Sequence, residues 1–288
     1  MTVFNVHHST RYRYRKLIKP GRHEWLARPR DSFDQRLFDC RLSVHPSPKE
    51  MRWIHDVFGN CVTLVDFDSS TDELSFESVI RLDHIPENSP DFLIEDYARE
   101  HPFSYSPDEL PDLTPCIRRE FDDTTTANWL DRFISRKAQP TGRLLMTLNE
   151  AISESFSYRR RSVQGTQPPA VTIEQQTGSC RDFALLMMEA ARSLGFAARF
   201  VTGYVYVPDR DKAERLGGGS THAWCQIYVP GSGWVEFDPT NGIVGNKDLI
   251  RVAVARTPSQ AVPLSGSYWG DAADELGIEV EVYVTSES

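Results

Sequence analysis

Residues 1 to 86 show the alternation of apolar and polar positions that is typical of β-strands. Five stretches alternate in this way: Val3–Tyr14, Leu37–Val44, Met51–Val57, Cys61–Phe67 and Leu74–Leu82. Gly59-Asn60 lies between the third and fourth stretches and is a turn signal, which predicts a hairpin there. Several short strands at close spacing, with no long helical pattern, predict a small antiparallel β-sandwich or barrel.

The pattern changes twice after this region. Prolines interrupt residues 87–125 every few positions, so we interpret this stretch as a connector between two domains. From residue 126 to 288 we expect a second domain, in which three apolar faces repeat with helical spacing: Trp129 to Ile134, Leu144 to Ile152, and Phe183 to Leu194. Residues 165–169 are predicted to be a loop. Strands are expected near 197–207, 222–229, 233–238 and 278–284.

Cys180 lies in the first turn of the third predicted helix, directly after Gly178 and Ser179. A helix N-terminus carries partial positive charge and stabilises an anion. The pKa of a thiol falls from about 8.5 toward about 3.5–7.5 in such a setting, most strongly beside a protonated histidine. The position therefore favours Cys180 as a nucleophile, the alternative being a free thiol packed as a small apolar residue. Asp182 is expected to cap the helix.

His222 and Asp238 lie in two predicted strands joined by the turn Pro230–Gly233. If Asp238 faces Trp224, His222 is its diagonal neighbour on the same face of the hairpin. A slip of one residue would separate them. A carboxylate holds an imidazole in one tautomer and orientation. Each residue also has a structural alternative, a strand-end hydrogen bond or a turn, but the order Cys, His, Asp is that of a nucleophile, its base and the residue that orients the base.

The chain resembles the transglutaminase-like core of bacteria and archaea from about residue 140 to 245, in the segments FSYRR, TGSCRDFALLMMEAARSLGFAARFVTGYV and HAWCQIYVPGSGWVEFDPTNG. HHSTRYRY, RPRDSFDQ and DVFGN also resemble the N-terminal β domain that often precedes this core. The resemblance implies an α+β protein in which a papain-like cysteine-enzyme core follows a small antiparallel β-sandwich. It implies Cys180, His222 and Asp238 as the catalytic triad. One departure follows DPTNG, where Val254–Pro258 replaces a usual glycine-arginine-aspartate stretch.

Acyl transfer also needs hydrogen-bond donors that stabilise the oxyanion, each worth about 3 kcal/mol. The backbone N–H of Cys180 at the helix start is one natural donor. Candidates for a second donor are Tyr158, Gln175 and Gln176. The structural alternative is that Tyr158 is a packed aromatic residue and that the two glutamines are loop residues. Trp224 is either part of the core or a wall of the substrate groove.

Composition narrows the class of protein. The chain has 288 residues, of which 40% are hydrophobic and 25% charged, as in an average soluble globular protein. A formal charge of −9 argues against a nucleic-acid partner, and the basic cluster Arg11–Lys16 fits the solvent face of a strand. No apolar run approaches the ~20 residues of a membrane helix. Five cysteines without a CxxC pair, and no apolar N-terminal signal, lead us to expect a cytoplasmic protein without disulfides.

We expect no cofactor and no metal. Cys180, His222 and Asp238 could form a zinc site, but the local HExxH or CxxC spacing is absent, as is an EF-hand loop. The predicted function is a cysteine peptidase or amidase that cleaves amides of a peptide or protein substrate through an acyl-thioester. The alternatives are a protein-glutamine transglutaminase and a non-catalytic module that binds a partner. The sequence predicts no oligomeric state.

Overall fold

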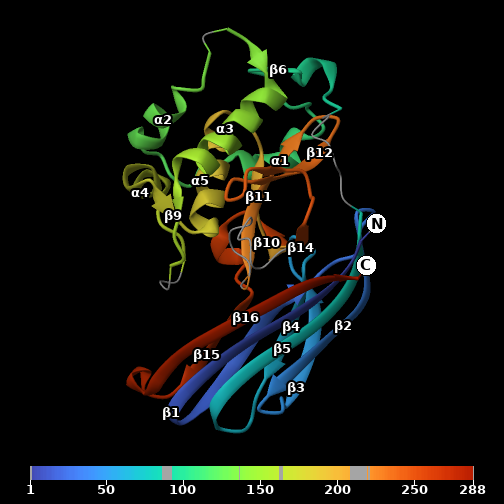
Figure 1. Ribbon diagram of the computed structural model, residues 1–288, viewed down its shortest axis with the longest axis vertical. Helices are drawn as coiled ribbons and strands as arrows, with labels where there is room; N and C mark the ends of the chain where they lie inside the picture. Colours follow the sequence, from blue (N-terminus) through green and yellow to red (C-terminus); the bar gives the residue numbers. More distant parts are fainter. Residues whose placement is uncertain are drawn as a thin grey trace.

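The structure is a computed structural model that describes residues 2–85, 93–135, 137–161, 165–207, 219 and 221–287. Figure 1 shows a part with all the labelled helices above a long, twisted β-structure. The helices of the upper part are α1 (Leu110–Ile117), α2 (Thr124–Leu130), α3 (Thr141–Ser155), α4 (Pro169–Gln175) and α5 (Cys180–Ser193). Within the described residues, no helix is both long and apolar enough to cross a membrane.

The lower part is the predicted antiparallel β domain. Its N-terminal strands are β1 (Thr2–Arg28), β2 (Gln35–His45), β3 (Glu50–His55), β4 (Cys61–Asp66) and β5 (Thr71–His84), in the order β2-β5-β1-β4-β3. The first half of β1 pairs with β5 and the second half with β4, so the sheet curls around a shared core. In that core the rings of Trp25 and Phe76 stack with their centroids 5.6 Å apart. The five predicted strands are therefore confirmed.

Two C-terminal strands, β15 (Leu264–Trp269) and β16 (Glu275–Glu287), also belong to this β domain. Both pair with β1, and β16 runs antiparallel to it along its first half, with Val3 opposite Glu287. The division of the chain thus differs from the expected single domain over 126–288. Since β1 would otherwise expose a long edge of unpaired backbone groups, the returning strands complete the sheet.

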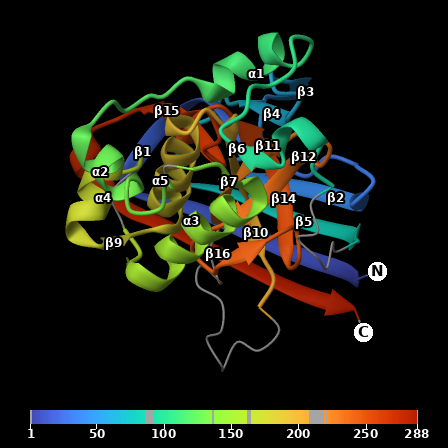
Figure 2. The ribbon, with the colours of Figure 1, turned by 90° about the horizontal axis from the view of Figure 1, so that it is seen from above.

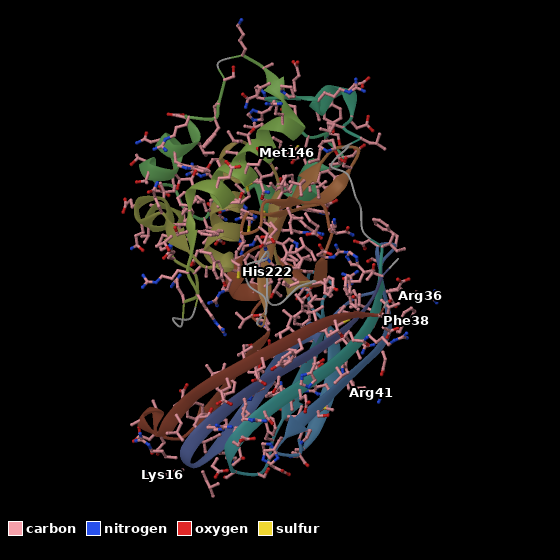
Figure 3. The ribbon with its side chains drawn as sticks, viewed as in Figure 1. Lys16, Arg36, Phe38, Arg41, Met146 and His222 are labelled. Atoms are coloured by element: carbon pink, nitrogen blue, oxygen red, sulfur yellow. The ribbon has the colours of Figure 1, made fainter. Side chains whose placement is uncertain are left out.

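The basic cluster Arg11–Lys16 lies on β1, as expected for the solvent face of a strand. Arg13 is 3.3 Å from Glu279 of β16, and Lys16 is 3.2 Å from Asp274 in the short 3₁₀ helix η4 (Ala272–Asp274). Figure 3 shows Lys16 at the lower tip of the β domain. Arg11 and Arg13 also lie 3.3 and 3.6 Å from Glu73 of β5, so the cluster pairs with acidic residues on both sides of β1.

The upper part is built on a five-stranded antiparallel sheet. Its strands are β10 (Ala198–Val205), β11 (His222–Val229), β12 (Gly233–Asp238), β13 (Ile243–Val244) and β14 (Leu249–Ala255), in the order β13-β12-β11-β10-β14. Helix α5 lies against β10 and β11, and its apolar face, including Phe183 and Met187, is fully buried. Figure 2 shows α2, α4 and α5 grouped on one side of these strands.

Short elements complete the upper part. They are β6 (Glu100–His101) paired with β7 (Gln139–Pro140), β8 (Ser157–Tyr158) paired with β9 (Thr177–Gly178), and the 3₁₀ helices η1 (Asp96–Ala98) and η3 (Pro258–Gln260). The loop predicted over residues 165–169 ends at residue 168, because α4 begins at Pro169. Helix α4 was not predicted. Proline is favoured at the first position of a helix, but seven residues are too few to show an apolar face in the sequence.

The connector predicted over 87–125 contacts the sheet, although residues 86–92 lie outside the described part of the chain. The hydroxyl of Tyr105 donates to the carbonyl of Tyr228 at 2.8 Å and accepts from the N–H of Ala197 at 2.9 Å. A ring nitrogen of His101 lies 2.9 Å from the carbonyl oxygen of Leu194, just beyond α5. The described part of the connector therefore fastens to both α5 and β11.

The two parts meet along β14, an edge strand of the upper sheet. The side-chain amide of Gln35 donates to the carbonyl of Arg251 and accepts from its N–H, at 2.8 and 3.0 Å. Asn60 makes the same pair of bonds with Val254, at 2.7 and 2.9 Å. Because Gln35 and Asn60 satisfy the free backbone groups of an edge strand, they hold the β domain in register against the upper sheet.

Candidate active site

Cys180 is the first residue of α5, where the sequence predicts it, and only 7% of its surface is exposed. Ser179 precedes it as the N-cap. The fully buried carboxylate of Asp182 accepts hydrogen bonds from both the N–H and the hydroxyl of Ser179, each at 2.8 Å. The predicted capping role of Asp182 is therefore confirmed. Cys180 therefore lies at the N-terminus of a helix, the end that carries partial positive charge.

Asp182 also holds the segment that precedes α4. Its second oxygen accepts from Nη1 of Arg161 at 2.7 Å and from the N–H of Gln167 at 2.8 Å. These two partners were not predicted, although Arg161 directly follows the FSYRR segment. A β-carbon at Gly178 would lie 3.0 Å from Asp182 and from Phe183, so a larger residue here would press on the start of α5. The position of Cys180 is thereby fixed from several sides.

His222 and Asp238 meet as the sequence predicts. The register of β11 and β12 pairs Cys225 with Phe237 and Val229 with Gly233, which confirms the assumed alignment. Nε2 of His222 lies 2.8 Å from Oδ2 of Asp238, and neither side chain is exposed to solvent. A hydrogen bond between a ring nitrogen and a carboxylate fixes the tautomer and the plane of the imidazole.

The carboxylate of Asp238 has further donors. The N–H of Thr240 donates to Oδ1 at 3.0 Å, and the side-chain amide of Asn241 donates to Oδ2 at 2.7 Å. Burial raises the pKa of Asp238, but the charge and hydrogen bond of His222, with Asn241 and Thr240, lower it below its usual range. Asp238 is therefore held as an anion. Asn241 was not predicted, yet the Asp-Pro-Thr-Asn turn that returns it to Asp238 is visible in the sequence.

The other ring nitrogen of His222, Nδ1, is buried and has no hydrogen-bond partner in the described part of the chain. Burial lowers the pKa of His222, but Asp238 and the neighbouring Cys180 outweigh burial and raise it to about 10. An imidazole with this pKa is protonated at neutral pH. In Figure 3, His222 lies in the lower half of the upper part, toward the β domain.

The three further site candidates lie in different surroundings. Tyr158 pairs across β8 and β9 with Gly178, and burial together with the nearby Cys180 raises the pKa of its phenol to about 12. Gln176 is exposed, as is Gln175, and adopts a left-handed conformation (φ 50°) with its carbonyl bonded to the N–H of Ser157. Tyr158 thus lies close enough to Cys180 for their charges to interact, whereas the carbonyl of Gln176 is bonded to β8.

Trp224 is completely buried. Its ring stacks on that of His222, with centroids 5.7 Å apart and planes 30° apart, and its indole N–H donates to the carboxylate of Glu236. This is the placement of a core residue behind the imidazole. Glu236 was not predicted, because a glutamate in a strand has no local signal that distinguishes burial from exposure.

The remaining thiols lie away from this arrangement or are inaccessible. All five cysteines are free. Cys225 is fully buried, donates weakly to the carbonyl of Phe237, and has its pKa raised by burial. Cys40 and Cys61 line a cavity of about 540 Å³ in the β domain. The described residues contain no group of three or more His, Cys, Asp or Glu side chains that could hold a metal ion.

Family models match both parts of the chain. Residues 127–239 match the transglutaminase-like superfamily, and residues 4–83 match the bacterial transglutaminase-like N-terminal region. The matched regions contain Cys180, His222 and Asp238, and also the Gln35 and Asn60 contacts to β14. The chain thus carries a transglutaminase-like core preceded by a bacterial transglutaminase-like N-terminal region.

Two mycobacterial proteins are similar to this chain over nearly their whole length. An uncharacterized protein of Mycobacterium tuberculosis is 26% identical over 294 residues, which cover 98% of this chain and 92% of the relative. An uncharacterized protein of Mycobacterium leprae is 25% identical over 301 residues, covering 98% and 99%. A crystal structure described as a "Putative Cysteine Protease from Cytophaga hutchinsonii" has a TM-score of 0.70 at 19% identity, and covers 100% of this chain and 92% of its own. This similarity shows a shared fold.

Proposed function

We propose that this transglutaminase-like protein hydrolyses amide bonds of peptides or proteins, with Cys180 as nucleophile, His222 as acid and base, and Asp238 as the residue that orients His222. One observation carries the proposal. Nε2 of His222 is bonded to Asp238, whereas the buried Nδ1 has no other partner in the described residues and Cys180 is its neighbour. An imidazolium so placed stabilises a thiolate and can deliver a proton.

The reaction follows from these three groups. The thiolate of Cys180 attacks the amide carbonyl, and a C–S bond forms while the carbonyl electrons move to the oxygen. The C–N bond then breaks, and the leaving amine takes the proton from Nδ1 of His222. Neutral His222 next takes a proton from water, whose oxygen attacks the acyl-thioester. The C–S bond breaks, which releases the acid and restores the thiolate–imidazolium pair.

The oxyanion needs donors that point at the carbonyl oxygen. The N–H of Cys180 lies at the first position of α5, where backbone N–H groups have no partner within the helix. Tyr158 is the second donor that we favour over Gln176, because its phenol lies near Cys180 and stays protonated with a pKa of about 12. Both donors come from the region that Gly178 and Asp182 hold in place.

The thiolate–imidazolium pair is tested by the rate of iodoacetamide alkylation against pH. The wild type is compared with Cys180→Ala and His222→Ala, and peptide mapping identifies the alkylated residue. We expect one thiol to react fast well below pH 8, to be absent in Cys180→Ala, and to slow in His222→Ala. Slow alkylation of all five thiols, with ordinary pH dependence, would instead support a non-catalytic binding module.

Hydrolysis is tested against amine transfer in a single experiment. A glutamine-containing peptide is incubated with a labelled primary amine, and released ammonia and acid are compared with covalent incorporation of the amine. We expect hydrolysis to exceed incorporation, in keeping with the cysteine-protease description of the Cytophaga protein that shares this fold. Incorporation that outruns hydrolysis would make the protein a transglutaminase, with the same nucleophile.

A further inference from the structure

Glu236 is a buried carboxylate for which the proposed reaction has no use. It lies on β12, two residues before Asp238, and its side chain is only 5% exposed. Oε1 accepts from Nε2 of Gln226 and from Nη1 of Arg251, each at 2.6 Å, while Oε2 accepts from the indole of Trp224. A carboxylate buried at this depth is costly unless it is paired, so these donors define its place.

Arg251 connects Glu236 to the other domain. Its Nη2 donates to both oxygens of Asp34, at 3.0 and 3.2 Å, while its Nη1 donates to Glu236. Burial lowers the pKa of Arg251, but the two carboxylates outweigh it and raise the pKa. For Asp34 burial acts in the opposite direction and raises the pKa, but the charge of Arg251 outweighs burial, and the pKa of Asp34 is lowered. The backbone of Arg251 is bonded at the same time to Gln35. Two consecutive residues of the β domain, Asp34 and Gln35, therefore bind the side chain and the backbone of Arg251.

Trp224 carries this contact to His222. Gly203 is the cross-strand partner of both His222 and Arg251. A β-carbon on Gly203 would lie 2.7 Å from the Trp224 ring and 2.1 Å from the carbonyl oxygen of Ile250. The indole therefore fills the space above Gly203, is fixed at its N–H by Glu236, and presents its face to the imidazole. Rotation of the indole would displace His222.

We infer that Asp34 and Arg251 are positioning residues for His222, acting through Glu236 and Trp224, so that docking of the β domain orients the catalytic imidazole. This inference rests on the proposed function, because it assigns a purpose to the orientation of His222. Displacing a reacting group by about 1 Å can cost about 100-fold in rate. A network with one partner removed leaves a buried charge unpaired, which favours such a displacement.

The variants Asp34→Asn and Glu236→Gln test the inference. Each keeps the side-chain size and removes one negative charge. Asp31→Asn is the matched control, because Asp31 is an exposed carboxylate of the same loop that bonds to the N–H of Leu37. Two rates are measured: alkylation of Cys180 by iodoacetamide across pH, and hydrolysis of p-nitrophenyl acetate as a small activated acyl donor. Unfolding followed by circular dichroism checks that each variant is folded.

We expect kcat for the ester to fall about 10-fold to 100-fold in both variants, with KM unchanged and Asp31→Asn like the wild type. The direction in which the pH profile of Cys180 alkylation moves distinguishes a misplaced His222 from the simple loss of a negative charge. Removing a negative charge alone would favour the thiolate and move the profile to lower pH. A misplaced imidazolium stabilises the thiolate less, so positioning moves the profile to higher pH, and this is the result we expect.

Unchanged or lower-pH profiles in both variants, with the His222→Ala profile displaced to higher pH, would overturn this inference and leave the proposed function standing. A His222→Ala profile identical to the wild type would overturn both. If Glu236→Gln fails to fold, Trp224→Phe takes its place, because it keeps a ring against His222 and loses the N–H bonded to Glu236.

Discussion

Cys180 and Cys225 are both buried thiols within the same domain, yet their surroundings are opposite. Cys180 is 7% exposed, begins a helix and neighbours the cationic His222. Cys225 is 0% exposed and lies in the middle of β11, where burial first, and then the charges of Glu236 and Asp238, raise its pKa. The two thiols therefore differ less in burial than in the sign of the charge beside them, and a neighbouring cation favours a thiolate whereas neighbouring anions oppose it.

The largest effect should come from removing the thiol beside the cation. Cys180→Ala should lower kcat by about 10⁶-fold, the scale of a lost nucleophile, and Cys180→Ser should restore little because a hydroxyl is not ionised by His222. The measurement is hydrolysis of p-nitrophenyl acetate under saturating substrate. Activity that survives in Cys180→Ala would remove this residue from the proposed triad.

The next effect should come from neutralising the charge that holds the cation. Asp238→Asn keeps the shape of the side chain but removes the carboxylate that stabilises protonated His222. The value of kcat should therefore fall about 10⁴-fold. The alkylation profile of Cys180 should move to higher pH. A profile that stays in place would mean that the thiolate does not depend on the Asp238 charge.

The raised pKa of His222 should also make the free energy of unfolding depend on pH. The pKa of His222 is raised from 6.5 to about 10 in the folded state, so its contribution to the free energy of unfolding is complete below pH 6.5. That contribution is lost as the pH rises through about 10. Urea unfolding across this range should therefore show a larger loss of stability in the wild type than in His222→Ala. Parallel pH curves for the two proteins would contradict the raised pKa.

The smallest effect on catalysis should come from the second thiol. Cys225→Ala should leave hydrolysis of p-nitrophenyl acetate unchanged, because the thiol of Cys225 donates to the carbonyl of Phe237 and otherwise packs among core residues. It should lower the free energy of unfolding by about 1 kcal/mol through lost packing, measured by urea denaturation. A loss of activity without a loss of stability would show that the contrast between the two thiols is wrongly drawn.

The placement of Cys180 at a helix start and of His222 beside Asp238 could be predicted from the sequence because each depends on a local signal. Gly178 and Ser179 mark the helix start, and the short turn Pro230–Gly233 leaves little freedom in the register of the strands that carry His222 and Asp238. The family resemblance rests on the same segments. Where the placement of a residue depends on its neighbours in sequence, pattern and spacing were sufficient to predict it.

The rest depends on partners that are distant in the chain. Asp34 and Arg251 are 217 residues apart, and neither carries a local sign of burial. The strand predicted near 278–284 is present in β16, but its pairing with β1 could not be derived, because strand propensity does not name a partner. The buried Glu236 was missed for the same reason, since its donors come from β11 and β14.

The return of β15 and β16 to β1 makes the upper part an insertion within the β domain, with both ends of the chain side by side, as Figure 1 shows. A domain joined at one end could swing away on its linker, whereas one held at both ends keeps a high effective concentration at its docking surface. Contacts too weak to join two separate chains can therefore stay formed here. The grip of the β domain on Arg251 is in this sense an intramolecular binding reaction, and the topology of the chain favours its bound state.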